Sequence, residues 1–168
     1  DTAECMLESK RLGFSDAFLG HLTGTTELAV RDMRLHHHIH SDVKKIDTVA
    51  GEFPCNTNYL YCTYATTPTS RKATSNAEKV LVLGSGVYKI GSSVEVDWCT
   101  VSCMRELRTL GKKVIILNCN PETVSTDFDE ADQLYFCEIN LETVLEIYNF
   151  ENPEGVIVSV GGQAPNNI

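Results

Sequence analysis

The stretch Val80 to Asp97, which reads VLVLGSGVYKIGSSVEVD, decides the fold of this chain. It opens with four apolar residues and no polar alternation, which is typical of a strand buried on both faces of a parallel sheet. Gly84, Gly86 and Gly91 follow, and then a pattern compatible with a helix. A buried strand, a glycine turn and a helix start form a backbone concavity where free N–H groups and the helix dipole favour an anion.

The spacing of these glycines departs from two common phosphate-binding motifs. Four residues separate Gly86 from Gly91, so the loop is not the G-x-G-x-x-G fingerprint, and no Gly-Lys-Ser/Thr sequence ends it as in a P-loop. Such a turn can equally serve to pack a helix against a sheet. Glu95 and Asp97 suit a helix start, either as charges on a solvated helix end or as part of a site, and Lys89 places a cation in the loop.

The composition bounds the class of protein. A chain of 168 residues can bury one core, or one small domain with an appendage. Its net charge of −9 argues against a nucleic-acid partner, and no apolar run approaches the ~20 residues that cross a bilayer. No signal segment is present at the start. Because the chain begins with Asp1 rather than Met, we expect a processed or partial chain.

Cysteines and histidines do not predict a metal site. Seven cysteines are scattered along the chain without a C-x-x-C pair. Cys99 and Cys103 would share a helix face, but no second pair or nearby histidine completes a zinc site. We interpret the cysteines as buried free thiols in a reducing compartment. The histidines at 36–38 and 40 favour a solvated helix end over a metal site.

The two halves of the chain differ in pattern. Residues 1–40 predict short helices, one with apolar residues from Leu12 to Leu22 and Ser15 or Asp16 as its N-cap, and a second after Gly24. Residues 59–64 predict a strand or an extended segment, and 66–76 a flexible linker. From residue 79 onward, strands alternate with helices, which predicts a doubly wound parallel sheet. The expected strands are 80–83, 114–117, 134–136 and 155–160, and the expected helices are 98–110, which Gly111 ends, and 141–148.

Polar or glycine-rich residues follow three of these strands. Since the carboxyl ends of parallel strands meet at one edge of a sheet, residues far apart in sequence are expected to converge there. The residues expected to share this crevice are Glu95, Asn118, Asn120, Glu122 and Gln163.

Three strings in this half of the chain resemble the carbamoyl phosphate synthetase family. They are GSGVYKIGSSVEVDWC at 84–99, NCNPETVSTDFD at 118–129 and GGQAPNN at 161–167. The match is closest to the second synthetase half of eukaryotic sequences. Upstream, IDTVAGEFP at 46–54 and TNYLY at 57–61 resemble the connector between the oligomerisation domain and that half.

The resemblance implies a domain organisation. It assigns 1–43 to the helical end of the oligomerisation domain, 44–78 to the connector and 79–168 to a Rossmann-like pre-ATP-grasp domain. The chain then stops before the ATP-grasp domain, which in this family binds most of the ATP and Mg²⁺. We therefore expect no metal ligand within the chain itself.

The resemblance also implies an activity. The family makes carbamoyl phosphate for pyrimidine or arginine synthesis from bicarbonate, two ATP and ammonia, usually derived from glutamine. The second half phosphorylates carbamate. The implied partners are the carbamate intermediate, the ATP-grasp domain, the first synthetase half, a glutamine amidotransferase and further copies in an oligomer. The expected location is the cytoplasm, or the mitochondrion for a urea-cycle form. A chain of this length is not expected to be active alone.

Site residues carry over motif by motif. Glu95 and Glu122 match active-site or tunnel carboxylates. The residues that match the lining of the carbamate tunnel are Gly84, Gly86, Lys89, Gly91, Ser93, Asn118, Asn120, Gly161, Gly162 and Gln163. A shielded polar route suits carbamate because carbamate is labile in water.

The chain departs from the family pattern at several positions. Lys89 stands where Arg is usual, which keeps the charge but loses the planar fork. Val96 replaces an aromatic residue and Ala164 a larger one, which we interpret as packing changes. Residues 36–40 and 66–76 do not match. Two alternatives from other classes are an NAD-type dinucleotide-binding module and a non-catalytic oligomerisation scaffold.

Overall fold

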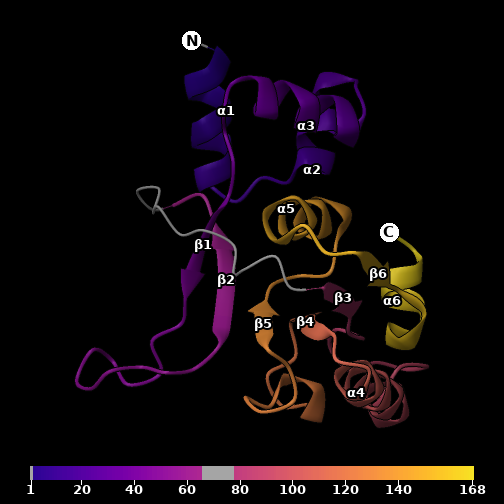
Figure 1. Ribbon diagram of the computed structural model, residues 1–168. Coiled ribbons are helices and arrows are strands. Elements are labelled where there is room, and N and C mark those ends of the chain that lie inside the picture. The colour runs from indigo at the N-terminus through magenta and orange to yellow at the C-terminus, as the bar shows by residue number, and fades with distance from the viewer. Residues whose placement is uncertain (1, 66–77) are drawn as a thin grey trace. The chain divides into compact units, whose positions relative to one another are not determined.

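The structure, a computed structural model, describes residues 2–65 and 78–168. Within these residues the chain forms two compact units. The first, 2–43 with 62–65, is mainly helical, and the second, 44–61 with 78–168, is built on a sheet. Figure 1 gives the elements in chain order. The linker predicted at 66–76 lies outside the described residues.

The helical unit contains α1 (Thr2–Arg11), α2 (Asp16–Thr23) and α3 (Glu27–His36). The predicted N-cap Ser15 is confirmed, since its hydroxyl accepts a hydrogen bond from the backbone N–H of Phe18 at 3.1 Å. Thr26 caps α3 in the same way. The expectation that the first helix includes Leu12 is wrong. Gly13 has a φ of 91°, so the chain turns there between α1 and α2.

A buried ion cluster holds the helical unit together. Arg34 lies 2.9 Å from Asp16, and Lys10 lies 3.0 Å from the same carboxylate, with all three side chains almost fully buried. Both cations also lie over the ring of Tyr64, at 5.1 and 5.5 Å from its centroid. Burying charges is costly unless they are paired, so loss of Asp16 would leave two buried cations without their carboxylate.

Within residues 2–65 and 78–168, the sheet has six strands in the order β1-β2-β5-β4-β3-β6. The pairs β2–β5, β5–β4, β4–β3 and β3–β6 are all parallel. This confirms the predicted Rossmann-like doubly wound α/β fold preceded by helices. The strand bounds are β1 Asp42–Lys45, β2 Tyr59–Thr63, β3 Lys79–Leu83, β4 Lys113–Asn118, β5 Gln133–Phe136 and β6 Gly155–Ile157.

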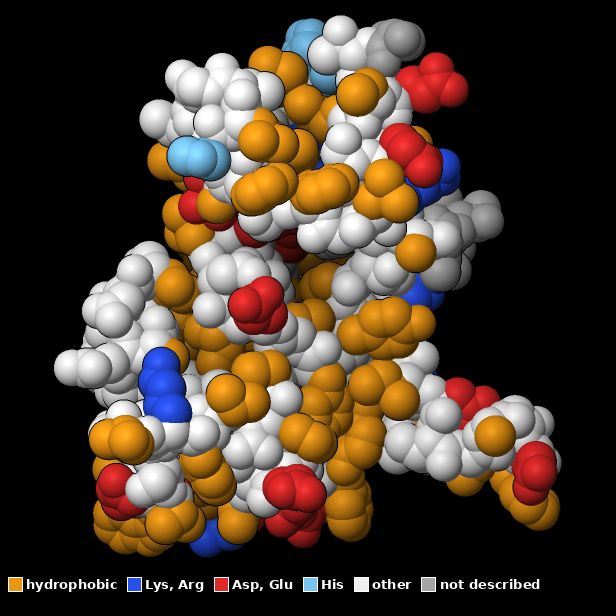
Figure 2. Space-filling view, turned by 180° about the vertical axis from the view of Figure 1, so that it is seen from behind, with side chains coloured by type: hydrophobic (Ala, Val, Ile, Leu, Met, Phe, Trp, Pro, Cys, Tyr) orange, Lys and Arg blue, Asp and Glu red, His pale blue; other side chains and the backbone are white. Residues whose placement is uncertain are grey.

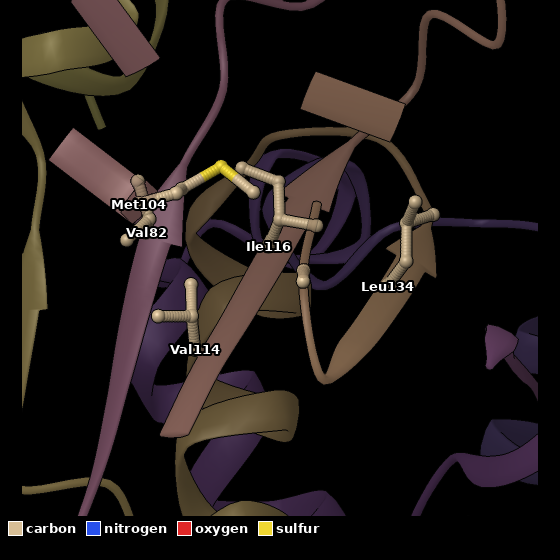
Figure 3. Close-up of a cluster of buried hydrophobic side chains, with 6 residues drawn as sticks. Val82, Met104, Val114, Ile116 and Leu134 are labelled. Carbon is tan, nitrogen blue, oxygen red and sulfur yellow. The ribbon is translucent and has the colours of Figure 1, made fainter. Parts of the chain in front are cut away.

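Two helices cover opposite faces of the sheet, α4 (Val94–Thr109) and α5 (Leu141–Glu151) (Figure 1). On the α4 face, Met104 packs against a row of apolar side chains from neighbouring strands (Figure 3). The row follows the strand register, in which Val82 pairs with Ile116 and Ile116 with Leu134. Alternate residues such as Leu81 and Ile115 are buried on the other face. The short elements η1 (Val124–Thr126), η2 (Ser159–Gly161) and α6 (Gln163–Asn166) lie in the loops.

Three expectations about the sheet unit need correction. Helix α4 begins at Val94, four residues before the expected start, although Gly111 follows its end as predicted. Strand β6 ends at Ile157 rather than at residue 160, because Val158 adopts helical backbone angles (φ −99°, ψ −40°) and leads into η2. Strand β1 was not expected.

The cysteines are free, as predicted, but they are not buried. Cys5 and Cys99 are exposed and the other five are half-buried. Cys99 lies on the solvent side of α4, where its thiol takes no part in the core. In the described part of the chain, no cluster of His, Cys, Asp and Glu side chains is placed to hold a metal ion. No helix there has both the length and the apolar character to cross a membrane.

Candidate functional site

Three loops meet at the carboxyl ends of β3, β4 and β6. Strand β3 lies between β4 and β6, so chain order reverses around it, and such a switch point is where open α/β sheets place their ligands. The loops approach one another closely at two glycines. A Cβ atom built on Gly161 would lie 2.6 Å from the carbonyl oxygen of Leu83, and one built on Gly84 would lie 2.6 Å from Cγ of Asn118. Glycine at both positions is required for this approach.

Asn118 links two of these loops. Its side chain is fully buried, and Oδ1 accepts hydrogen bonds from the backbone N–H groups of Gly86 at 3.0 Å and Cys119 at 2.9 Å. Its amide nitrogen donates to the hydroxyl of Ser125 at 3.3 Å. Asn118 therefore fixes the loop conformation and has little capacity left for a ligand. The sequence predicts Asn118 at the carboxyl end of its strand, but it does not predict these hydrogen bonds.

The loop after β4 is ordered by its own polar side chains. Oδ1 of Asn120 accepts a hydrogen bond from the backbone N–H of Glu122 at 3.0 Å, and the hydroxyl of Thr126 donates to the carbonyl of Asn120 at 3.0 Å. Thr123 and Ser125 are buried and hydrogen-bonded to each other at 3.0 Å. The turn leaves the side chain of Glu122 exposed, so its carboxylate is available to a ligand.

The loop after β3 is a tight turn that carries exposed side chains. Lys89 and Ser92 form an antiparallel bridge with two backbone hydrogen bonds of 2.9 Å. Lys89 and Gly91 are exposed, whereas Ser85 and Ser92 are buried and their hydroxyls have no hydrogen-bond partner among the described residues. Buried polar atoms normally bond to protein or water. These two serines belong to the candidate site, although sequence reasoning did not single them out.

Glu95 lies in the first turn of α4 and is exposed. Its carboxylate accepts a hydrogen bond from the hydroxyl of Ser93. This bond and one from its own backbone N–H lower the pKa of Glu95, against the opposing effect of burial. The pKa of the Tyr88 hydroxyl is raised instead, because burial and the nearby carboxylates of Asp97 and Glu95 disfavour its charged form. Glu95 is thus held as a carboxylate.

Asp97 is buried and ties α4 to the loop after β4. Its Oδ2 accepts a hydrogen bond from the backbone N–H of Ser125 at 3.2 Å, and its Oδ1 has no partner within the part of the chain that the structure describes. The sequence pattern indicated a helix-start carboxylate at this position. Its contact with a residue 28 positions further along the chain arises only once α4 packs beside β4.

The third loop follows β6. Gly161 is buried beneath the loop after β3, and the hydroxyl of Thr100 on α4 donates to the carbonyl of Val160 at 3.2 Å. A Cβ atom on Gly162 would lie 3.4 Å from Val96, so α4 also packs against this loop. Gln163 begins the short helix α6 and is exposed.

The structure therefore divides the predicted site residues into two groups. The first group is brought together by buried side chains and close backbone contacts, and Asn120 joins it because its backbone N–H donates to Oδ1 of Asn118. Its members are Gly84, Gly86, Asn118, Asn120, Gly161 and Gly162. The exposed group is Lys89, Gly91, Glu95, Glu122 and Gln163, with Ser93 half-buried beside Glu95. Among the described residues, the side chain of Glu95 bonds to Ser93 and not to Lys89, Glu122 or Gln163.

An exposed apolar surface borders these loops. Large apolar side chains that would normally avoid water are exposed on the loop after β3 and on the first turns of α4. They are Val87, Tyr88, Ile90, Val94 and Trp98. Figure 2 shows hydrophobic side chains exposed over the sheet unit on the face that it draws.

Comparison with known proteins gives the same family as the sequence motifs. The family model described as carbamoyl phosphate synthase preATP-grasp domain matches residues 76–168, which is more than half of the chain. The chain is 54% identical over 165 residues to the carbamoyl phosphate synthase arginine-specific large chain of Cutaneotrichosporon cutaneum. It is 55% identical over 167 residues to the multifunctional protein pyrABCN of Emericella nidulans, and 53% identical over 167 residues to the mitochondrial carbamoyl-phosphate synthase [ammonia] of Rattus norvegicus.

These alignments cover nearly all of this chain and a small part of each relative. They include 98–99% of the chain, which spans 14%, 7% and 11% of those three relatives. The matched residues contain the three loops that meet at the sheet edge. On the family match, the chain belongs to the carbamoyl phosphate synthase pre-ATP-grasp domain family.

Proposed function

We propose that this chain is part of a carbamoyl phosphate synthase, in the half that phosphorylates carbamate with ATP. The observation that carries the proposal is the meeting of three family-matched loops at the switch point of the sheet. In this reaction a carbamate oxygen attacks the γ-phosphorus of ATP, the bond to the β–γ bridging oxygen breaks, and carbamoyl phosphate and ADP form. Positioning and charge stabilisation provide most of the catalysis of such a transfer.

ATP and Mg²⁺ would be held outside this chain. The loop after β3 is not a P-loop, and the described residues contain no carboxylate cluster that fits a metal. The ATP-grasp domain of a longer parent protein would hold both. The exposed apolar surface from Val87 to Trp98 is where we expect that domain to pack.

Within the chain, the exposed side chains would act on carbamate. Glu95 and Glu122 would accept hydrogen bonds from its amino group, and Lys89 would pair with its carboxylate oxygen. The glycine backbone between them would exclude water, which decomposes carbamate. The first synthetase half and a glutamine amidotransferase would supply carbamate and ammonia. The parent would act in the cytoplasm, or in the mitochondrion if it is a urea-cycle form.

We test the proposal in the parent protein by its reverse reaction, the formation of ATP from carbamoyl phosphate and MgADP. Glu122→Gln and Glu95→Gln should each lower the rate by on the order of 10- to 100-fold without loss of folding, because each removes a charged hydrogen-bond acceptor. Glu106→Gln, on an exposed part of α4, is the matched control and should have no effect. No ATP from a folded wild-type parent, or normal rates in both variants, would refute the proposal.

An NAD-type dinucleotide-binding module is the main alternative. In such modules an acidic residue at the end of the second strand binds the ribose. Here that strand ends with Asn118, which is buried and bonded to backbone N–H groups. A fluorescence titration with NADH separates the two functions, and we expect no saturable binding.

We also propose that residues 1–43 form the helical end of an oligomerisation domain. Large apolar side chains are exposed on this unit, among them Leu12, Phe18, Leu22 and Leu28. Light scattering with and without residues 1–45 tests this role. A mass that does not change on deletion would argue against it.

A further inference from the structure

Ser93 occupies the N-cap position of α4 but does not cap it. N-cap serines normally accept a hydrogen bond from a backbone N–H in the first turn, which satisfies one of the unpaired donors there. Ser15, Thr26 and Asn140 do so at the starts of α2, α3 and α5. Ser93 has extended backbone angles (φ −137°, ψ −154°) as a cap should, yet it makes no such bond.

The hydroxyl of Ser93 instead donates to the carboxylate of Glu95. Glu95 is the second residue of α4, where the positive end of the helix dipole also favours a carboxylate. Its own backbone N–H provides a further hydrogen bond, and both bonds lower its pKa. Tyr88 and Asp97 are the other titratable groups near Glu95, and the pKa of Glu95 is lowered in their presence.

We propose that Ser93 is a positioning residue that holds the Glu95 carboxylate in one orientation, so that Glu95 accepts a hydrogen bond from the carbamate amino group. This inference rests on the function proposed above, because it concerns that same site. A carboxylate fixed from one side presents its remaining lone pairs in one direction, which reduces the ordering that substrate binding would otherwise require.

The first experiment requires no enzyme activity. The carboxyl carbon of Glu95 is followed by NMR as a function of pH in the wild-type chain, in Ser93→Ala and in Ser93→Thr. Removal of the hydroxyl should raise the pKa of Glu95, and threonine, which keeps the hydroxyl and suits extended backbone, should restore it. An unchanged pKa in Ser93→Ala would overturn the inference.

The second experiment uses the parent protein and the ATP-forming reaction. Ser93→Ala should lower kcat by about three- to tenfold, the range expected for a hydrogen bond to a partly exposed charged group. The acid limb of its pH–rate profile should move to higher pH, and Ser93→Thr should return both to wild type. Combined with Glu95→Gln, Ser93→Ala should cause no further loss, because the two residues act as one unit.

Stability provides the control for a merely structural role. Ser15→Ala removes a true cap and should lower the melting temperature, whereas Ser93→Ala removes a bond to an exposed carboxylate and should lower it by less. If wild type forms ATP and Ser93→Ala matches it in rate and pH profile, the positioning role is refuted and the proposed function stands. If folded wild type forms no ATP, the proposed function fails and this inference fails with it.

Discussion

Oδ1 of Asn118 lies 3.0 Å from the backbone nitrogen of Gly86, across the boundary between two neighbouring strand-end loops. The bond joins residues 32 positions apart, and the same oxygen also accepts from the N–H of Cys119. The buried side chain of Asn118 therefore joins the loop after β3 to the loop after β4 through hydrogen bonds to their backbone.

Asn118→Ala should therefore destabilise the chain strongly. It leaves buried N–H groups and the Ser125 hydroxyl without their partner, and we expect a loss of about 2–4 kcal/mol in the free energy of unfolding. Asn140→Ala, which removes one capping bond at the start of α5, is the control and should cost about 1 kcal/mol. Urea unfolding measures the stability of both variants. Equal losses would show that the several hydrogen bonds of Asn118 stabilise the fold no more than the one capping bond of Asn140.

Gly161→Ala should test the close approach of backbone at the site. The added Cβ would lie 2.5 Å from Cγ of Pro165 and 2.6 Å from the carbonyl oxygen of Leu83, so backbone must move, at a cost of about 1–3 kcal/mol. Gly155→Ala in β6 meets no atom within 4 Å and should change stability by less than about 0.5 kcal/mol. A Gly161→Ala chain with wild-type stability would contradict this geometry.

Cys55 should be the most reactive thiol near neutral pH. Hydrogen bonds from Thr57 and Thr48 lower its pKa to about 6, so it is mostly thiolate at pH 7. Its alkylation rate should rise with pH and level off above about 6, as measured by mass spectrometry of the peptides. Thr57→Val should move this midpoint to higher pH, since it removes a hydroxyl 3.1 Å from the sulfur.

Cys103 is the internal control for this experiment. Burial raises the pKa of its thiol, so it should react slowly at pH 7 in the same sample. Equal rates for Cys55 and Cys103 would contradict the assignment.

Asp132 should make stability depend on pH in the acid range. Burial raises its pKa, but hydrogen bonds from Lys113 at 2.8 Å and from the backbone N–H of Val114 at 2.9 Å outweigh this and bring the pKa below its ordinary value. A lowered pKa in the folded state contributes stability above the unfolded pKa, near 3.9, and this contribution is lost as pH falls through the folded value.

Asp132→Asn should therefore be less stable than wild type at pH 6, by about 1 kcal/mol, and the difference should shrink towards pH 2. Urea midpoints at pH 6, 4 and 2 measure it. Glu106→Gln is the control, and a difference between wild type and Asp132→Asn that does not vary with pH would contradict the assignment.

The spacing of apolar residues and the positions of the glycines predicted the central part of the fold. The buried runs at β3 and β4 and the helix α4 between them can be predicted with little tertiary information, because both faces of these strands are covered. Strand β1 was missed because Asp42–Lys45 has a single apolar residue, as is common for an edge strand. The apolar run after Gly155 predicted too long a strand, since Val160 and its neighbours turn into η2 to place Gly161 against β3.

The meeting of the three strand-end loops could be predicted from the sequence, whereas the contacts of the individual side chains could not. Topology alone brings the loops after β3, β4 and β6 to one edge of the sheet. The sequence does not show that Asn118 accepts a hydrogen bond from the backbone of Gly86, or that Asp97 accepts one from the backbone of Ser125. Both bonds join segments about 30 residues apart. The Ser93–Glu95 bond is local, but the choice between capping and bonding a carboxylate depends on side-chain rotamers.

The glycine contacts at the sheet edge have a consequence for redesign. The loops approach one another closely at Gly84 and Gly161, whereas the side chains proposed to face a ligand, such as Lys89, Glu122 and Gln163, are exposed. Exchanges at those three positions should each change the free energy of unfolding by no more than about 0.5 kcal/mol. A combinatorial library confined to these three positions should therefore leave the fold intact.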